Sequence, residues 1–189
     1  AYQLHKAKGA SIIVTNPNPI RWGSGQDKND EQLRTQARAL TELGKKLTGI
    51  GLTLAYHNHD AELRNAAREF HHMMVGTDPK HVTLCLDAQW VYRGSGNSNV
   101  ALLDIVRLYG DRVTELHLRQ ERSGAWSETF CAGEIDYPSV VGILDKKGVN
   151  PHLVLEQAPE QGTPHTMDPV EVHRHSAEYA RRLCAPLAE

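Results

Sequence analysis

The feature that most constrains the fold of this 189-residue chain is a regular alternation of short apolar runs with amphipathic helical segments. The apolar runs are rich in Val, Ile, Leu and Thr, as buried strands are, and they span residues 11–15, 52–56, 82–86, 113–118 and 153–155. Helical spacing of apolar residues follows each run, over residues of about 30–47, 61–75, 102–109, 137–147 and 168–183. Five such βα units predict a parallel sheet with helices packed against it.

Two α/β architectures fit repeated βα units: a doubly wound sheet and a (β/α)8 TIM barrel. A doubly wound sheet would predict a glycine-rich phosphate-binding turn after the first strand. This chain has Asn16-Pro-Asn-Pro19 there, and it contains neither G-x-G-x-x-G nor a P-loop. We therefore expect the TIM barrel. Since a complete barrel has eight units, residues 1–189 are interpreted as one barrel domain that lacks about three N-terminal units. Residues 2–9 are interpreted as the end of a helix that runs into a strand.

Composition argues against several classes of protein. The formal net charge of −2 and the pI near 6.6 give no reason to expect a nucleic acid or an anionic membrane surface as a partner. No apolar run is long enough to predict a transmembrane helix, and no signal peptide is recognisable. The three widely spaced cysteines, Cys85, Cys131 and Cys184, are typical of reduced thiols in a cytoplasmic protein.

Metal-ligand side chains stand at the ends of successive predicted strands. Asp87, His117 and Glu156 end the third, fourth and fifth strands and are separated by 30 and 39 residues, one βα unit each. The carboxyl ends of neighbouring parallel strands lie side by side, about 4.8 Å apart, so these side chains can surround one ion. Carboxylates and imidazole are ligands for divalent metals, and clustered carboxylates would be costly without a cation. The sequence therefore predicts a divalent-metal site.

The second strand offers several candidates for a further ligand. It ends in Tyr56-His57-Asn-His59 and is followed three residues later by Glu62. From the residues alone, His57, His59 and Glu62 all stay open as the first ligand of the series.

The chain resembles a known family in five segments, YHNHDAEL (56–63), LDAQW (86–90), ELHLRQ (115–120), CAGEIDYPSVVGIL (131–144) and LVLEQ (153–157). These look like the last five units of the xylose isomerase-like TIM barrels. That family is also grouped as sugar phosphate isomerases/epimerases and is related to endonuclease IV. In it, Glu, Asp, His and Glu from consecutive strands hold one divalent metal ion, such as Mn, Mg, Co or Zn. The resemblance implies Asp87, His117 and Glu156 as three of these ligands.

The chain departs from the usual family pattern at its second strand. Typical epimerases carry the first Glu within this strand, where this chain has Ala55-Tyr56-His57. The resemblance is closer to a subgroup with an H-N-H-x-x-E signature. It implies Glu62 as the first ligand and places His59 beside the substrate.

A second departure follows the fourth strand. Many members have H-x-K-D there, whereas this chain has His117-Leu-Arg119-Gln120. Arg119 can still bind a substrate oxygen or carboxylate through its guanidinium fork. Gln120 lacks the charge of the usual Asp, which argues against simple ketose epimerisation. Trp90 and Trp22 are further candidates for substrate binding, as apolar walls of the pocket.

The chemistry that the resemblance implies is proton abstraction next to a carbonyl of a sugar or polyol. Glu156 and Glu62 are the candidate proton-transfer groups, with His59 or His57 as an additional acid or base. We expect a metal-dependent isomerase or epimerase. The runner-up is a lyase or dehydratase that acts on keto-sugars, inososes or 3-keto-glycosides, because extra histidines favour a reaction in which a leaving group is protonated.

Two alternatives belong to other classes. An endonuclease IV-like enzyme would need more ligands for a trinuclear zinc cluster and a basic groove, and neither is evident. A non-catalytic or incomplete barrel that acts as a binding module is the other alternative. In that case a further N-terminal segment or a second copy in a homo-oligomer would complete the barrel.

Overall fold

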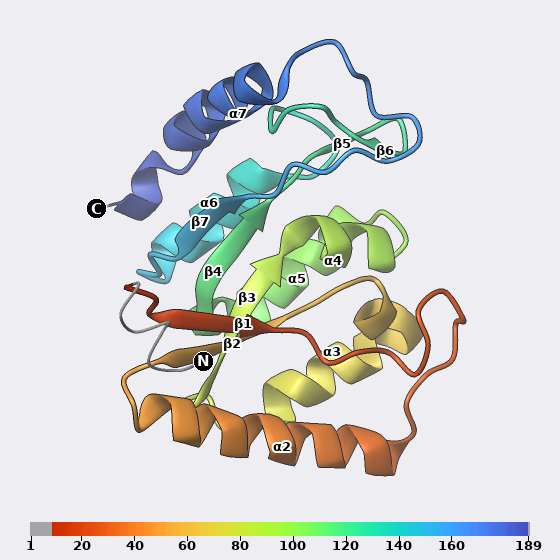
Figure 1. Cartoon of the computed structure of the whole chain (residues 1–189), viewed down its shortest axis with the longest axis vertical. Coiled ribbons are helices and arrows are strands. Elements are labelled where there is room, and N and C mark those ends of the chain that lie inside the picture. Colours follow the sequence, from red (N-terminus) through yellow and green to blue (C-terminus); the bar gives the residue numbers. More distant parts are fainter. Residues whose placement is uncertain (1–8, 189) are drawn as a thin grey trace.

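The computed structural model describes residues 9–188, so the helix end predicted within residues 2–9 lies almost wholly outside the described residues. Five parallel strands form one sheet in the order β1-β2-β3-β4-β7 (Figure 1). Their bounds are Ile12–Thr15, Thr53–His57, Val82–Asp87, Val113–Leu118 and His152–Leu155. All five predicted strands are therefore confirmed. The order of the strands across the sheet is the same as their order along the chain, as expected for repeated right-handed βα units.

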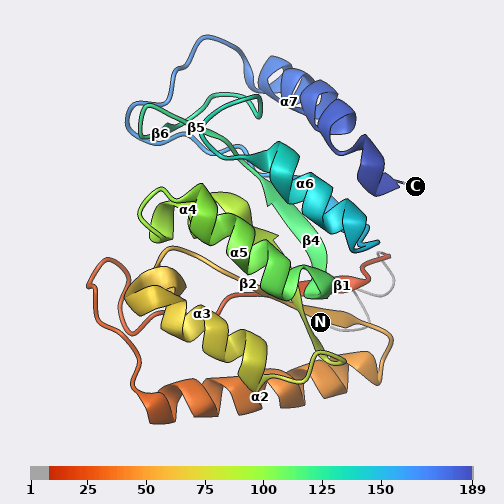
Figure 2. The ribbon, with the colours of Figure 1, turned by 180° about the vertical axis from the view of Figure 1, so that it is seen from behind.

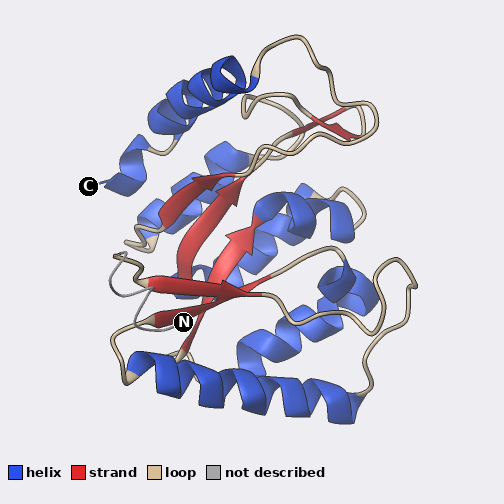
Figure 3. Ribbon diagram, in the orientation of Figure 1, coloured by secondary structure: helices blue, strands red, loops and turns tan. Residues whose placement is uncertain are grey.

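The helices pack on one face of this sheet. They are α2 (Asp30–Thr48), α3 (Arg64–Gly76), α4 (Ala88–Gly94), α5 (Asn99–Tyr109), α6 (Tyr137–Lys146) and α7 (Pro169–Leu183), with short 3-10 helices η1 (Ala61–Leu63), η2 (Gly110–Arg112) and η3 (Ala185–Ala188). Figure 2 shows α3, α5 and α6 in front of the sheet, and Figure 3 shows the strands from the opposite side. The arrangement is part of a (β/α)8 barrel, in which this helix-free face points inward.

Period-two alternation along the strands separates the core from the site. Leu54, Leu84, Leu86 and Leu116 are fully buried toward the helices and form the centre of the hydrophobic core. Residues at the intervening positions point to the helix-free face. The register aligns His57 with Cys85, Cys85 with Glu115, and Asp87 with His117, so titratable side chains form a row across β2, β3 and β4.

Side-chain caps explain where the long helices begin. The side chain of Asn29 accepts from the backbone N–H of Gln32, whose own side chain accepts from the N–H of Asn29, so this capping box starts α2. Asp136 caps α6 and Asp168 caps α7 in the same way, through backbone N–H groups two or three residues further on.

The structure also contains elements that the sequence analysis did not predict. Helix α4 begins directly after Asp87, whose Oδ1 accepts from the N–H of Trp90 at 2.9 Å. Strands β5 (Glu121–Arg122) and β6 (Ala125–Trp126) form a small hairpin. Its turn, Ser123-Gly124, has positive φ at both positions (53° and 78°), as a type I′ turn requires. Both elements lie at the carboxyl ends of the strands and contribute to the site described below.

Among residues 9–188, no helix combines the length and the apolar character that crossing a membrane requires. All three cysteines are free; Cys85 and Cys184 are buried, whereas Cys131 is partly exposed.

Candidate metal and active site

Three predicted ligands meet at the carboxyl edge of the sheet. Asp87 is the last residue of β3, His117 lies on β4, and Glu156 directly follows β7. One ligand atom from each lies within 4.8 Å of the others. Nδ1 of His117 is 2.8 Å from Oε2 of Glu156 and 4.0 Å from Oδ2 of Asp87. We call these three residues the carboxylate site. Two carboxylates and an imidazole at this spacing suit a divalent cation.

The guanidinium of Arg119 neutralises both carboxylates of this site. It donates to Oδ2 of Asp87 at 3.3 Å and lies 2.8 Å from Oε1 of Glu156. Arg119 is 2 % exposed, so its charge acts with little screening by solvent. The hydroxyl of Tyr137 accepts from the backbone N–H of Arg119 and donates to its carbonyl, which fixes the backbone at this point. Arg119 is therefore held in the site by its backbone as well as by its charge.

Two tryptophans enclose the Arg119 side chain. Its Cζ atom lies 4.2 Å from the ring centroid of Trp126 and 5.4 Å from that of Trp90. Trp90 also lies 5.7 Å from the ring of His59, and the ring of Trp22 lies 5.2 Å from His59 on its other side. Trp22 and Trp90 thus line the site next to His59. Trp126 belongs to the same aromatic wall, and the sequence analysis did not select it.

The histidines at the end of β2 stay uncharged at neutral pH. Burial, assisted by the nearby His117, lowers the pKa of His57 to about 3. Burial also lowers the pKa of His59, whose buried Nδ1 atom has no hydrogen-bond partner among the described residues. The ring of His57 is 4.8 Å from that of His59 and 4.8 Å from that of His117. Neutral imidazoles in such a position can accept a proton or bind a metal.

Glu62 lies apart from the carboxylate site. Its Oε2 atom accepts from the backbone N–H of His59 at 2.7 Å, and its buried Oε1 atom has no partner among the described residues. Burial raises the pKa of this carboxyl group. No metal-type group among the described residues includes Glu62, so its role as first ligand stays a prediction.

The charged groups of the carboxylate site change each other's proton affinity. Burial raises the pKa of Asp87 in spite of the opposing charge of Arg119. Burial acts in the same direction on Glu156, but the hydrogen bond to His117 and the charge of Arg119 outweigh it and lower its pKa. For His117, burial favours the neutral ring, but the hydrogen bonds to Glu156 and Glu115 raise its pKa. The site therefore contains at least one ionised carboxylate that is stabilised by neighbouring cations.

A second arginine ties three segments around the site together. Arg93 of α4 donates to Oε2 of Glu121 at 3.1 Å and to both carboxylate oxygens of Glu160 at 2.7 and 3.0 Å. Oε1 of Glu160 also accepts from the backbone N–H of Trp126 at 2.8 Å. These contacts join α4, the β5–β6 hairpin and the loop after β7, and we call them the Arg93 bridge. No local sequence pattern could have indicated it, because its residues lie up to 67 positions apart.

Polar side chains also fix the strand ends. Asn58 accepts from the N–H of Asp87 and donates to its carbonyl, both at 3.1 Å, which joins the end of β2 to the end of β3. Gln120 accepts from the N–H of Glu121 and exchanges hydrogen bonds with the backbone of Ile135, so it orders the loop after β4. A Cβ atom at Gly133 would come within 2.4 Å of the Gln120 side chain, which explains the glycine there.

The chain is similar to a family model and to curated proteins. A family model described as a xylose isomerase-like TIM barrel matches residues 2–183. The chain is 31 % identical over 120 residues to an inosose dehydratase of Bacillus velezensis, a match that covers 64 % of this chain and 37 % of the relative. It is 27 % identical over 169 residues to the inosose dehydratase of Bacillus licheniformis, covering 74 % and 55 %. The chain thus spans about half the length of the curated relatives that it matches.

The fold is similar to that of a solved structure as well. A sugar phosphate isomerase/epimerase from Parabacteroides distasonis superposes with a TM-score of 0.75 at 18 % identity, over 99 % of this chain and 62 % of the other. Together with the parallel sheet and the extent of the family match, this similarity confirms the fold class and the family resemblance. The chain belongs to the xylose isomerase-like TIM barrel family.

Proposed function

We propose that this chain carries the catalytic face of a divalent-metal-dependent enzyme that removes a proton next to the carbonyl of a cyclic polyhydroxy ketone and eliminates water from it. The observation that supports this most is the convergence of Asp87, His117 and Glu156 beside neutral imidazoles and a buried arginine. An inosose-like keto-cyclitol is the substrate class that we infer.

The donor set of the carboxylate site fits a divalent cation. Asp87, His117 and Glu156 would hold it, and Glu62 is the predicted first ligand. Oxygen and nitrogen donors of this kind are compatible with Mn, Mg, Co or Zn. When bound, such an ion supplies Lewis-acid stabilisation of the negative charge that develops on the substrate oxygen.

Arg119 is the residue that we assign to substrate binding. Its Nε atom is buried and has no partner among the described residues, so a donor is available for a substrate oxygen. Cation–π contacts with Trp90 and Trp126 help to hold the guanidinium in place. Trp22, 53 % exposed beside His59, would cover the outer side of the same pocket.

His59 is our first candidate for the proton-transfer group, with His57, Glu156 and Glu62 as the other predicted candidates. Since its pKa is lowered, His59 is neutral before reaction and can take the proton from the carbon next to the carbonyl. The imidazolium that forms can then give this proton to the departing hydroxyl. One imidazole would thus serve first as base and then as acid.

Two considerations favour dehydration over isomerisation. The curated relatives named above are inosose dehydratases, and a pair of histidines provides for protonation of a leaving group. Isomerisation or epimerisation of a sugar is the second candidate, since it shares the proton-abstraction step and is the activity named for the Parabacteroides distasonis neighbour. Gln120, where many members carry Asp, speaks against the simple ketose reaction.

The experiment follows an inosose and a keto-sugar in deuterium oxide by NMR and mass spectrometry, with Mn²⁺ present. Dehydration gives a product that has lost one water, whereas epimerisation gives an isomer with solvent deuterium and no loss of water. We expect loss of water from the inosose. If the keto-sugar is isomerised and the inosose loses no water, the dehydratase proposal is wrong and the isomerase or epimerase hypothesis takes its place.

Variants identify the residues responsible. Asp87→Asn should lower the rate of dehydration by at least about 100-fold, because it removes a negatively charged ligand of the proposed metal ion. Glu178→Gln is the matched control, since Glu178 is an exposed carboxylate on α7, and its rate should equal that of the wild type. Equal rates in both variants would overturn the site assignment.

A further inference from the structure

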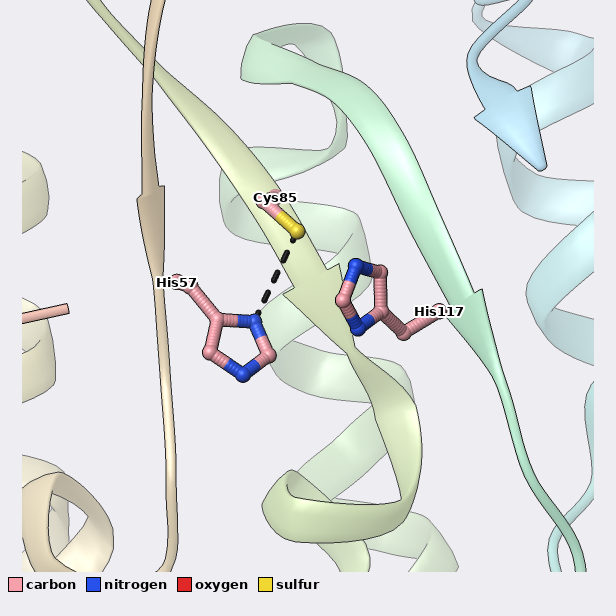
Figure 4. A group of neighbouring side chains, drawn as sticks. All are labelled: His57, Cys85 and His117. Carbon is pink, nitrogen blue, oxygen red and sulfur yellow. Dashed lines mark hydrogen bonds between the residues drawn. The ribbon is translucent and has the colours of Figure 1, made fainter. Parts of the chain in front are cut away.

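A second group of side chains that can bind a metal ion lies beside the carboxylate site and shares His117 with it. It consists of His57 on β2, Cys85 on β3 and His117 on β4, and one ligand atom from each lies within 4.8 Å of the others. Figure 4 shows the two imidazole rings on either side of the Cys85 thiol. Sγ of Cys85 is 3.5 Å from Nδ1 of His57. The sequence analysis interpreted Cys85 only as a reduced buried thiol.

Strand register explains why these three residues meet. His57 pairs with Cys85 across β2 and β3, and the pairing of Cys85 with Glu115 places His117 two residues further along β4 on the same face. All of them therefore point to the helix-free face of the sheet. The strands hold this group in place, so it does not depend on a loop conformation.

The Glu115 carboxylate lies beside this group. Its Oε1 atom accepts from the Cys85 thiol at 3.4 Å and lies 3.0 Å from Nε2 of His117. The other ring nitrogen of His117, Nδ1, lies 2.8 Å from Glu156. The His117 ring thus has the carboxylate site on one side, and Cys85 with Glu115 on the other.

We propose that His57, Cys85 and His117 form a second site for a thiophilic divalent cation such as Zn²⁺, with the Glu115 carboxylate beside it. The donor chemistry differs from that of the carboxylate site, because one sulfur and two imidazole nitrogens prefer zinc over magnesium or manganese. Three protein donors leave one position of a tetrahedral zinc ion for a further ligand.

Burial is compatible with this assignment. His57 is buried, and burial favours the neutral imidazole that a zinc ligand needs. Cys85 is fully buried and would lose its proton on binding, so a cation of high affinity for sulfur is required. A dication would also compensate the Glu115 carboxylate, which accepts from the thiol in its absence.

The site shares His117 with the carboxylate site, but its thiol allows metal binding there to be distinguished by absorption spectroscopy. Co²⁺ bound to a thiolate absorbs in the near ultraviolet through sulfur-to-metal charge transfer, and Co²⁺ bound only to oxygen and nitrogen does not. The experiment titrates the metal-stripped chain with Co²⁺ without oxygen and then adds Zn²⁺. We expect a thiolate band that saturates with added Co²⁺ and that Zn²⁺ abolishes.

Two serine variants assign the band to one thiol. Cys85→Ser should lose it, whereas Cys184→Ser, which changes another buried free thiol, should keep it. Asp87→Asn should also keep the band while losing metal from the carboxylate site, so failure of this site and failure of the proposed function are distinguishable.

A measurement on the wild type covers the case in which Cys85→Ser does not fold. X-ray absorption at the cobalt edge should detect one sulfur neighbour at about 2.3 Å. Absence of both the thiolate band and the sulfur neighbour at saturating Co²⁺ would overturn the proposal. So would a band that survives in folded Cys85→Ser and disappears in Cys184→Ser.

Discussion

Arg119 lies between two carboxylates that would otherwise repel each other, the fully buried Asp87 and the partly exposed Glu156. Its guanidinium contacts both Asp87 and Glu156. In the metal-free protein, Arg119→Met would remove the arginine that contacts both carboxylates, and we expect the free energy of unfolding to fall by about 3 kcal/mol. Added Mn²⁺ should then stabilise this variant more than the wild type, because the ion replaces the lost charge. Urea unfolding with and without Mn²⁺ measures both effects.

A matched arginine controls this prediction. Arg107 forms an exposed ion pair with Asp104 on α5, so Arg107→Met should change stability by less than about 1 kcal/mol. Equal stability of Arg119→Met and Arg107→Met would mean that Arg119 does not balance the site.

Glu62 gives a pH-dependent prediction. Burial raises its pKa in the folded protein above the ordinary value of 4.5. Between these two values the folded state binds more protons than the unfolded chain, so its stability falls as pH rises. Glu62→Gln cannot ionise and keeps an oxygen for the N–H of His59. In metal-free protein we expect it to exceed the wild type in stability at neutral pH, with no advantage below about pH 4.

Urea unfolding at several pH values tests this sign, and metal analysis of the same variant tests the ligand role. A variant less stable than wild type at neutral pH would contradict the expected effect of burial. Loss of metal from Glu62→Gln, with Glu178→Gln unchanged, would identify Glu62 as the first ligand.

Part of the site could be predicted from the residues themselves. Asp87, His117 and Glu156 were predicted because each ends an apolar strand one unit after the last. Cys85 and Glu115 stand two positions before Asp87 and His117, so period-two alternation could have placed them on the same face. The sequence analysis considered only the strand ends and therefore missed them.

At the scale of elements, the Arg93 bridge holds the loop after β7 against the hairpin and α4. Glu160 lies in that loop, and two charge-assisted hydrogen bonds connect it to Arg93. The backbone N–H groups of Trp126 and Thr163 donate to the side chain and the carbonyl of Glu160, respectively. Arg93→Met should release the loop, and we expect hydrogen exchange at these two N–H groups to accelerate by at least about 10-fold. Hydrogen exchange followed by mass spectrometry measures this change.

The control is Arg174→Met, which removes an exposed arginine from α7. It should leave the exchange of both segments unchanged. An Arg93→Met variant with unchanged exchange would show that the loop is held by other contacts.

The long elements could be predicted and the short ones could not, for a physical reason. Strands and helices of one unit carry their own periodicity and caps, as Asn29 and Asp168 illustrate. Helix α4 has seven residues and depends on Asp87 as its cap, and β5 and β6 have two residues each. Such short segments are stabilised by tertiary contacts, so no local sequence pattern predicts them. Trp126 was missed because it lies on β6.

At the scale of the whole molecule, the two faces of the sheet have different roles, one in stability and the other in the proposed chemistry. Its helix-covered face contributes the apolar core, and its other face contributes the titratable row across β2, β3 and β4. Both could be predicted, because alternation within strands and the order of the units are properties of the sequence. Arg119 was predicted as a substrate-binding residue, but its contact with both carboxylates depends on where the neighbouring strands end.

The central claim is that Asp87, His117 and Glu156 hold one divalent cation at the strand ends, and metal analysis tests it most directly. The chain is stripped of metal, equilibrated with Mn²⁺, desalted and analysed for bound metal, alongside Asp87→Asn, Glu156→Gln and the control Glu178→Gln. We predict about one Mn²⁺ per chain in the wild type and in the control, and loss of most of it in the other two variants. Equal metal content in all four proteins would contradict the account.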